Sequence, residues 1–169
     1  MKKLTESLEK YLLAIYELVK KQDIVKVKDV SQYLKIGGPS TADAIRTLAE
    51  REFIDYVPYG EITITTKGKI TIENKINRRN TISKFLNQVL DIDETLAKAD
   101  AKAIEYSMTE DVLDKFVFFL NFMEQCTCKE PKWIKSCKHN LKNGNFSTLC
   151  KECMKGNTPI CCGSCCENS

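Results

Sequence analysis

The last 44 residues of the chain contain all nine of its cysteines, and no residue type here is better suited to metal chemistry. Two Cys-x-x-Cys pairs occur, Cys150/Cys153 and Cys162/Cys165. Such a turn lets two thiolates converge on one ion, and two further cysteines complete a tetrahedron. The ligand set that we expect is Cys128, Cys137, Cys150 and Cys153, with Cys126, Cys162 and Cys165 as additional candidates.

The spacing of these cysteines leaves the metal open. Four sulfur ligands suit Zn²⁺ and an iron–sulfur cluster equally well. Nine is an odd number for a disulfide framework, and the segment has no periodic apolar pattern, so a bound metal would supply its folding energy. Zinc would be structural, whereas a cluster would sense redox state, oxygen or iron. His139, the only histidine, is interpreted as a surface residue rather than a ligand.

The first 68 residues contain the elements of a small DNA-binding domain. Apolar spacing predicts helices over about 4–21, 28–34 and 39–51, with a tight turn at Lys35-Ile36-Gly37-Gly38 before the third. Alternation then predicts strands over 54–57 and 62–65 around a hairpin tip at 58–61, and Lys67-Gly68 is expected to end the unit. Helix, helix, turn, helix and hairpin is the order of a winged helix-turn-helix.

The third helix carries the residues that we expect to meet double-stranded DNA. Pro39 fits a first helical turn, and the small polar residues after it can approach base edges. Residues 1–90 carry 16 Lys and Arg against 11 acids, a balance of +5 that favours a polyanion. The predicted contacts are Pro39, Ser40, Thr41, Ala42, Asp43, Arg46, Tyr59 at the hairpin tip, and Lys67. The alternative is a winged helix that binds a protein partner.

The middle of the chain is predicted to be a helical dimerisation domain. Helices are expected over about 69–89, 94–106 and 111–124, and the last is apolar nearly all round. Its extra apolar side would meet a second subunit. The predicted fold class is therefore mainly α: a winged helix-turn-helix domain (1–70), a helical dimerisation domain (71–125) and a small Cys-rich metal-binding tail (126–169).

Several stretches together resemble one known family. They are Leu8–Tyr16, Val27–Leu34, Pro39-Ser40, Thr65-Thr66-Lys67-Gly68 and Phe85-Leu86. In order and spacing they are similar to the iron- and manganese-dependent repressors of the diphtheria-toxin-repressor (DtxR/MntR) family, over about residues 4–124. The resemblance implies a homodimer that binds a palindromic operator.

The metal site that the resemblance implies is not matched. Position by position, its ligands fall on Lys10 and Leu13, on Arg79 and Ser83, on Lys98, and on Lys102, Glu105 and Tyr106. Only Glu105 is a good ligand, because protonated Lys and Arg repel a cation. We therefore do not expect the usual Mn²⁺ or Fe²⁺ site. Either Lys10, Arg79 or Lys102 pairs with Glu105 and replaces the metal, or the site has decayed into exposed charges.

These observations predict a transcriptional regulator with metal or redox input through the cysteines. The alternative is a metal-handling or redox protein whose winged helix docks a protein. An enzyme, such as a thiol oxidoreductase, is not expected, because no βαβ unit or nucleophile–base constellation accompanies the cysteines. No apolar run is long enough to span a membrane and no signal stretch is present, so a cytoplasmic location is expected.

Overall fold

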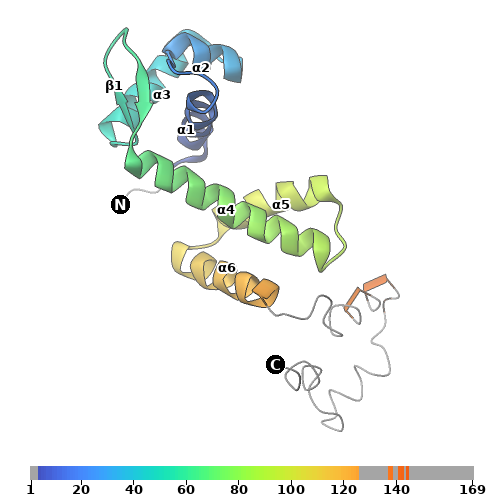
Figure 1. Cartoon of the computed structure of the whole chain (residues 1–169). Coiled ribbons are helices and arrows are strands. Elements are labelled where there is room, and N and C mark those ends of the chain that lie inside the picture. The colour runs from blue at the N-terminus through green and yellow to red at the C-terminus, as the bar shows by residue number, and fades with distance from the viewer. Residues whose placement is uncertain (1–3, 126–136, 139–140, 143, 145–169) are drawn as a thin grey trace. The chain divides into compact units, whose positions relative to one another are not determined.

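The computed structural model describes residues 4–125, 137–138, 141–142 and 144. Contacts divide the chain into two units, Met1–Ile76 and Asn77–Ser169, which we call the first and second units. The division falls inside a helix, six residues after the boundary that the sequence suggested. Figure 1 shows the elements of both. They are α1 (Glu6–Val19), α2 (Val27–Leu34), α3 (Gly38–Glu50), β1 (Ile54–Tyr56), β2 (Ile62–Ile64), α4 (Thr66–Gln88), α5 (Glu94–Ser107) and α6 (Glu110–Gln125).

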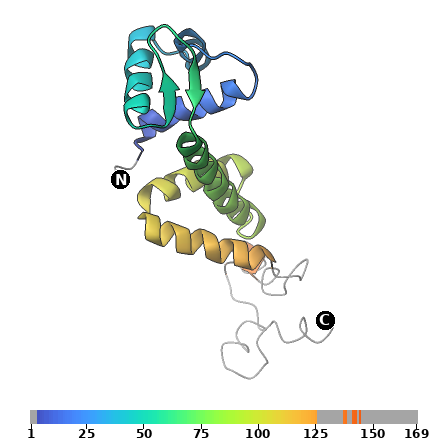
Figure 2. The same ribbon diagram turned by 60° about the vertical axis from the view of Figure 1, so that its left-hand side comes forward.

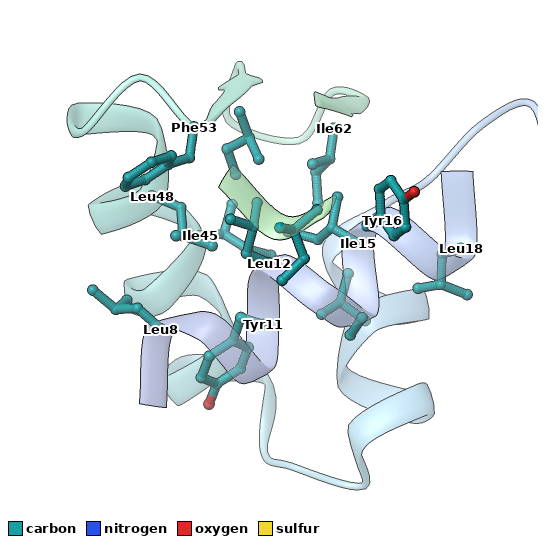
Figure 3. Close-up of a cluster of buried hydrophobic side chains, with 14 of the residues drawn as sticks. Leu8, Tyr11, Leu12, Ile15, Tyr16, Leu18, Ile45, Leu48, Phe53 and Ile62 are labelled. Atoms are coloured by element: carbon teal, nitrogen blue, oxygen red, sulfur yellow. The ribbon is translucent and has the colours of Figure 1, made fainter. Parts of the chain in front are cut away.

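The first unit packs its helices and hairpin around one apolar core (Figure 3). The most deeply buried side chains come from every element except the hairpin tip: Leu12, Ile15, Val30, Ile45, Leu48, Ile54, Ile62 and Ile72. Thr5 caps the first helix, since the amide of Leu8 donates to Thr5 Oγ1 at 3.4 Å. The α1 stripe predicted from helical spacing is thus the surface on which α2, α3 and β2 pack.

The hairpin is antiparallel and is attached to the rest of the first unit. The two strands lie side by side and run in opposite directions (Figure 2). Ile54 pairs with Ile64 and Tyr56 pairs with Ile62. The amide of Ile62 donates to the carbonyl of Val25, just before α2, at 2.8 Å. Burial alternates along both strands, with Ile54 and Ile62 inside, because successive side chains point to opposite faces.

The turn between α2 and α3 falls within the stretch Lys35–Gly38, where the sequence predicted it. Its left-handed residue is Lys35, with φ 55°, while Gly37 is the N-cap and Gly38 already lies in α3. The Ser31 hydroxyl donates to the carbonyl of Ile36 at 2.6 Å, and the amide of Ile36 donates to the carbonyl of Ser31. These bonds hold a conformation that a non-glycine residue otherwise avoids.

Lys67 and Gly68, which were expected to end the hairpin unit, lie in the first turn of α4. Thr65 caps that helix, accepting from the amide of Gly68 at 3.0 Å and donating to the carbonyl of Glu52 at 2.8 Å. A Cβ at Gly68 would overlap the carbonyl of Phe53, whose carbon lies 2.9 Å away. The glycine is therefore needed for close packing of α4 against the start of the hairpin.

The second unit has its own core, formed by the second half of α4 with α5 and α6. Its buried residues are Ile82, Leu86, Ala97, Ala101, Leu113 and Leu120. Asp93 caps α5, accepting from the amides of Thr95 and Leu96 at 2.9 and 3.2 Å. The three helices predicted here are confirmed, each bound lying within three residues of the expected one. In the part of the chain that the structure describes, no helix is both long and apolar enough to cross a bilayer.

Candidate nucleic-acid interface

The exposed face of α3 carries the polar residues expected to meet DNA. Pro39, Ser40, Asp43 and Arg46 are exposed, and Ala42 is half-buried. The Arg46 guanidinium pairs with the Asp43 carboxylate at 3.3 Å on this face. The carboxylate neutralises part of the charge and at the same time holds the guanidinium along the helix. The open N-terminal turn of α3 also presents amide groups and the positive end of the helix dipole.

Thr41 is placed differently from its neighbours. Its side chain is fully buried, and its hydroxyl donates to the carbonyl of Gly37 at 3.1 Å. The side chain belongs to the core and fixes the start of α3, while Ser40 and Asp43 on either side of it face outward. The burial of Thr41 determines which face of α3 is turned to solvent.

The hairpin tip presents an aromatic ring to solvent. Tyr59 is fully exposed and has a positive φ of 64°, and Val57 beside it is 70% exposed. The amide of Gly60 closes the turn on the carbonyl of Val57 at 2.8 Å. A closed turn that exposes a tyrosine suits contact with a groove of DNA or with its sugar-phosphate backbone.

Lys67 has a structural role that the sequence did not show. Its ammonium donates to the carbonyl of Arg51 at 2.8 Å and to Glu52 Oε2 at 2.9 Å. Arg51 is the C-cap of α3, where a cation is favourable to the helix dipole. The hydrogen bond from Lys67 and its charge also lower the pKa of the Glu52 carboxyl. The ammonium therefore fastens the end of α3 to the start of α4.

A buried ion pair joins α1 to α4 within the first unit. Lys75 Nζ lies 3.1 Å from Glu9 Oε2, and the two side chains are 7% and 4% exposed. Nearby, the Tyr16 hydroxyl donates to Glu73 Oε1 at 2.8 Å. The Glu9 carboxylate can lie inside the core because Lys75 gives it a partner there.

In the second unit, two consecutive arginines of α4 bind carboxylates of the other two helices. Arg79 Nε donates to Glu105 Oε2 on α5, and Arg78 pairs with Asp114 and, at 2.7 Å, with Glu110 on α6. Burial opposes the charge of Arg78, but these two carboxylates outweigh it and raise its pKa.

The residues at the implied metal site are thus partly brought together. Glu105 and Arg79 are in contact, and Lys102 Nζ lies 5.9 Å from the ring centre of Tyr106. Lys10 is exposed on α1 in the first unit. Within the described residues no group of three or more His, Cys, Asp or Glu side chains is arranged to hold a metal ion. Since Glu105 is bound to a guanidinium, this donor set does not fit Mn²⁺ or Fe²⁺.

The predicted cysteine site falls almost entirely outside the described residues. This applies to Cys126, Cys128, Cys150, Cys153, Cys162 and Cys165. Cys137 is described, and it is a half-buried free thiol. The Cys-rich tail, which we call the extension below, has an ion pair with the loop after α4. Lys142 Nζ lies 2.9 Å from Asp91 Oδ2 and lowers the pKa of the Asp91 carboxyl.

Comparison with known families gives two adjacent matches. Residues 3–62 match the iron dependent repressor N-terminal DNA binding domain. Residues 65–134 match the iron dependent repressor metal binding and dimerisation domain. The two matches follow the same order as the first and second units described above.

Individual relatives agree with these matches. An uncharacterized HTH-type transcriptional regulator of Methanocaldococcus jannaschii, MJ0568, is 26% identical over 118 residues, which is 69% of this chain and 94% of the relative. The crystal structure of the hypothetical protein SSo2273 from Sulfolobus solfataricus is 25% identical, with a TM-score of 0.60 over 69% of this chain and 89% of that one. A manganese-dependent transcriptional repressor in complex with manganese shares the fold, with 22% identity and a TM-score of 0.54 over 68% and 53% of the two chains.

Proposed function

The chain belongs to the iron-dependent repressor family, whose members are transcriptional regulators and not enzymes, and on that premise we propose that it is a repressor that binds a palindromic operator as a homodimer. It carries the family's DNA-binding domain and its dimerisation domain. In such a dimer, the two DNA-binding domains contact two half-sites that lie about one turn of the DNA helix apart. As a DNA-binding regulator it would act in the cytoplasm.

The exposed face of α3 is the observation that carries this proposal. Ser40, Asp43 and Arg46 are exposed on this face, and the tip of the hairpin exposes Tyr59. Pro39, Ser40, Ala42 and Asp43 lie at the end of α3 that reads base edges, and Arg46 reaches a phosphate. Thr41 and Lys67 contribute indirectly, since they fix the two ends of α3 through Gly37 and Arg51.

The surface of α6 supports the homodimer. One side of the helix packs into the second unit through Leu113 and Leu120. A separate arc of large apolar side chains is more than half exposed: Val112, Phe118, Phe119 and Phe122. An apolar patch of this kind marks an interaction surface. A second copy of the same unit can cover it, because in a two-fold symmetric dimer the same patch of both subunits meets at the interface.

We place the metal or redox input in the cysteine-rich extension. Cys128, Cys137, Cys150 and Cys153 have the spacing for Zn²⁺ or an iron–sulfur cluster. The ion pair between Lys142 and Asp91 links this extension to the second unit. Metal binding by these cysteines would change the relative placement of the two DNA-binding domains of the dimer, and therefore their fit to the two half-sites.

The deciding experiment is anaerobic purification of the full chain, followed by metal analysis, a visible spectrum and titration onto duplex DNA from upstream of its own gene. We expect sequence-selective binding with a steep salt dependence. Iron with sulfide and a broad visible band identifies a cluster, and colourless protein with stoichiometric zinc identifies a structural site. Bound metal without DNA binding at any salt concentration favours the alternative, a metal-handling protein whose winged helix binds a protein partner.

A further inference from the structure

Glu105 stands out among the residues at the implied metal site because it alone is a good ligand for a divalent ion. It lies in the core of the second unit, with a relative exposure of 1%. Its carboxylate accepts a hydrogen bond from Arg79 Nε. The Arg79 guanidinium lies 5.4 Å from the ring centre of Tyr106, and Lys102 Nζ lies 5.9 Å from the same ring centre. The surroundings of this buried carboxylate are therefore cationic.

A buried carboxylate needs a positive charge beside it, and a metal ion and a guanidinium are alternative ways to supply one. A divalent ion requires several ligands with lone pairs. A guanidinium has five N–H donors and no acceptor, so it binds a carboxylate but contributes nothing to a metal. Once Arg79 is paired with Glu105, the two solutions exclude each other at this place.

The neighbouring residue repeats the arrangement. Arg78 binds Glu110 and Asp114 of α6, as Arg79 binds Glu105 of α5. Two consecutive side chains of α4 thus attach both remaining helices of the second unit to it. Since arginine stays protonated throughout the physiological pH range, these attachments are present at every metal concentration.

We propose that Arg79 supplies permanently the positive charge that a metal supplies in relatives with a complete site. The second unit is then assembled, and dimerises, without Mn²⁺ or Fe²⁺. The chain also binds its operator without either ion at this place, a consequence that rests on the proposed function. The assembly of the second unit does not depend on that function and is testable without DNA.

The first test uses MnCl₂ as the probe on the full chain after treatment with EDTA. Mn²⁺ is a hard ion that prefers oxygen ligands, so the thiolates of the extension interfere little. We expect the paramagnetic resonance signal of free Mn²⁺ to stay unchanged on addition of protein. Binding to the upstream duplex should change by less than about twofold, far below the tenfold that corresponds to about 1.4 kcal/mol.

Either of two results overturns the inference. One is the loss of the Mn²⁺ signal at one ion per chain, reversed by Glu105→Gln. The other is operator binding that tightens tenfold or more with Mn²⁺. If the chain binds no DNA with or without Mn²⁺, the proposed function fails, whereas an unchanged Mn²⁺ signal still supports the inference about the second unit.

The second test measures thermal unfolding of the full chain. Arg79→Met leaves Glu105 buried without its guanidinium, and we expect the Tm to fall by about 10 °C. Adding Glu105→Leu to the Arg79→Met variant should restore most of the lost Tm. The matched control is Lys84→Met. Lys84 lies on the same helix as Arg79, and its half-exposed ion pair with Glu124 of α6 is lost in the variant, so the Tm should shift by no more than about 2 °C.

A double variant no more stable than Arg79→Met contradicts the pairing, as does an unchanged Tm for Arg79→Met. If Arg79→Met does not fold, Arg79→Lys and the double variant serve instead. Both should fold, because one keeps the charge and the other removes the carboxylate that needs it. Failure of both to fold contradicts the inference.

Discussion

Glu9 and Lys75 lie 66 residues apart in the chain and form an ion pair that is almost completely removed from water. The pair joins the first helix of the DNA-binding unit to α4, the helix that follows the hairpin. An isolated buried charge at either place would be strongly unfavourable, so each of the two residues needs the opposite charge of the other. The requirement gives a direct test of how this unit is held together.

Lys75→Met should lower the free energy of unfolding by about 3–5 kcal/mol, because it leaves the Glu9 carboxylate buried without its partner. Adding Glu9→Leu should recover much of the loss. Urea unfolding followed by circular dichroism measures both. Lys69→Met, at an exposed site on the same helix, is the control and should be nearly neutral. Equal effects of the single and double variants would show that the pair is not coupled.

Gly68→Ala should destabilise the first unit by about 1–3 kcal/mol or more, because the new methyl group overlaps the carbonyl of Phe53. Gly37→Ala is the matched control, since nothing lies within 4 Å of the position of its added Cβ. Thermal unfolding of the two variants, compared with the wild type, gives the answer. A Gly68 variant as stable as the Gly37 variant would mean that α4 packs less closely than described.

Arg46→Ala should weaken operator binding by about 1.5–3 kcal/mol per protomer, the value of a hydrogen bond to a charged group. The dependence of log K on log salt should become shallower by roughly 0.9 for each phosphate that the variant no longer neutralises.

Lys67→Met is the informative contrast to Arg46→Ala. It should lower thermal stability, because the bonds to Arg51 and Glu52 are removed, and leave the salt slope unchanged. Both quantities come from titrations at several salt concentrations and from a melting curve. A change of salt slope for Lys67→Met, with none for Arg46→Ala, would reverse the two assignments.

Acid should weaken the second unit partly through Asp93. Hydrogen bonds from the amides of Leu96 and Thr95 hold the pKa of this carboxyl below its ordinary value of 3.8. A lowered folded-state pKa stabilises the protein above the unfolded-state value, and the contribution is lost as the pH falls through the folded-state value. Asp93→Asn keeps the cap but cannot titrate, so its stability should fall less between about pH 5 and about pH 3. Urea unfolding at both pH values measures this, and identical losses for both proteins would contradict it.

Phe122→Glu should weaken the homodimer at least about tenfold, because it places a charge in the apolar arc of α6. Sedimentation equilibrium measures the dissociation constant directly. The control is Ile24→Glu, which changes a half-exposed apolar residue in the first unit. A dimer that survives the change at Phe122 would move the interface to another face.

Much of the architecture follows from local patterns in the sequence. Helical spacing in α1, strand alternation at Ile54 and Ile62, and the proline that opens α3 each predict their element to within a few residues. These signals are local, since each is read within a single helix or hairpin. The family resemblance rests on their order and spacing, and the comparisons confirm the family.

The parts that sequence reasoning missed depend on residues far apart in the chain. Neither Glu9 nor Lys67 has a neighbour in sequence that reveals its partner, and a charged residue on a helix is normally assigned to the solvent face. Periodicity groups Thr41 with its exposed neighbours because it does not identify a polar residue that bonds to its own turn. Of the candidate sites, the Arg79–Glu105 pair is one of the two alternatives that the sequence leaves open, and the structure contains that pair.

The capping of α4 has a practical consequence for building chimeras from relatives of this chain. Thr65 bonds simultaneously to Glu52 and Gly68, and Gly68 rests on Phe53. A splice placed between the hairpin and the helix would separate residues that must be inherited together. Exchanges of DNA specificity between homologues should therefore be joined downstream of Gly68, so that the donor segment brings its own first helical turn.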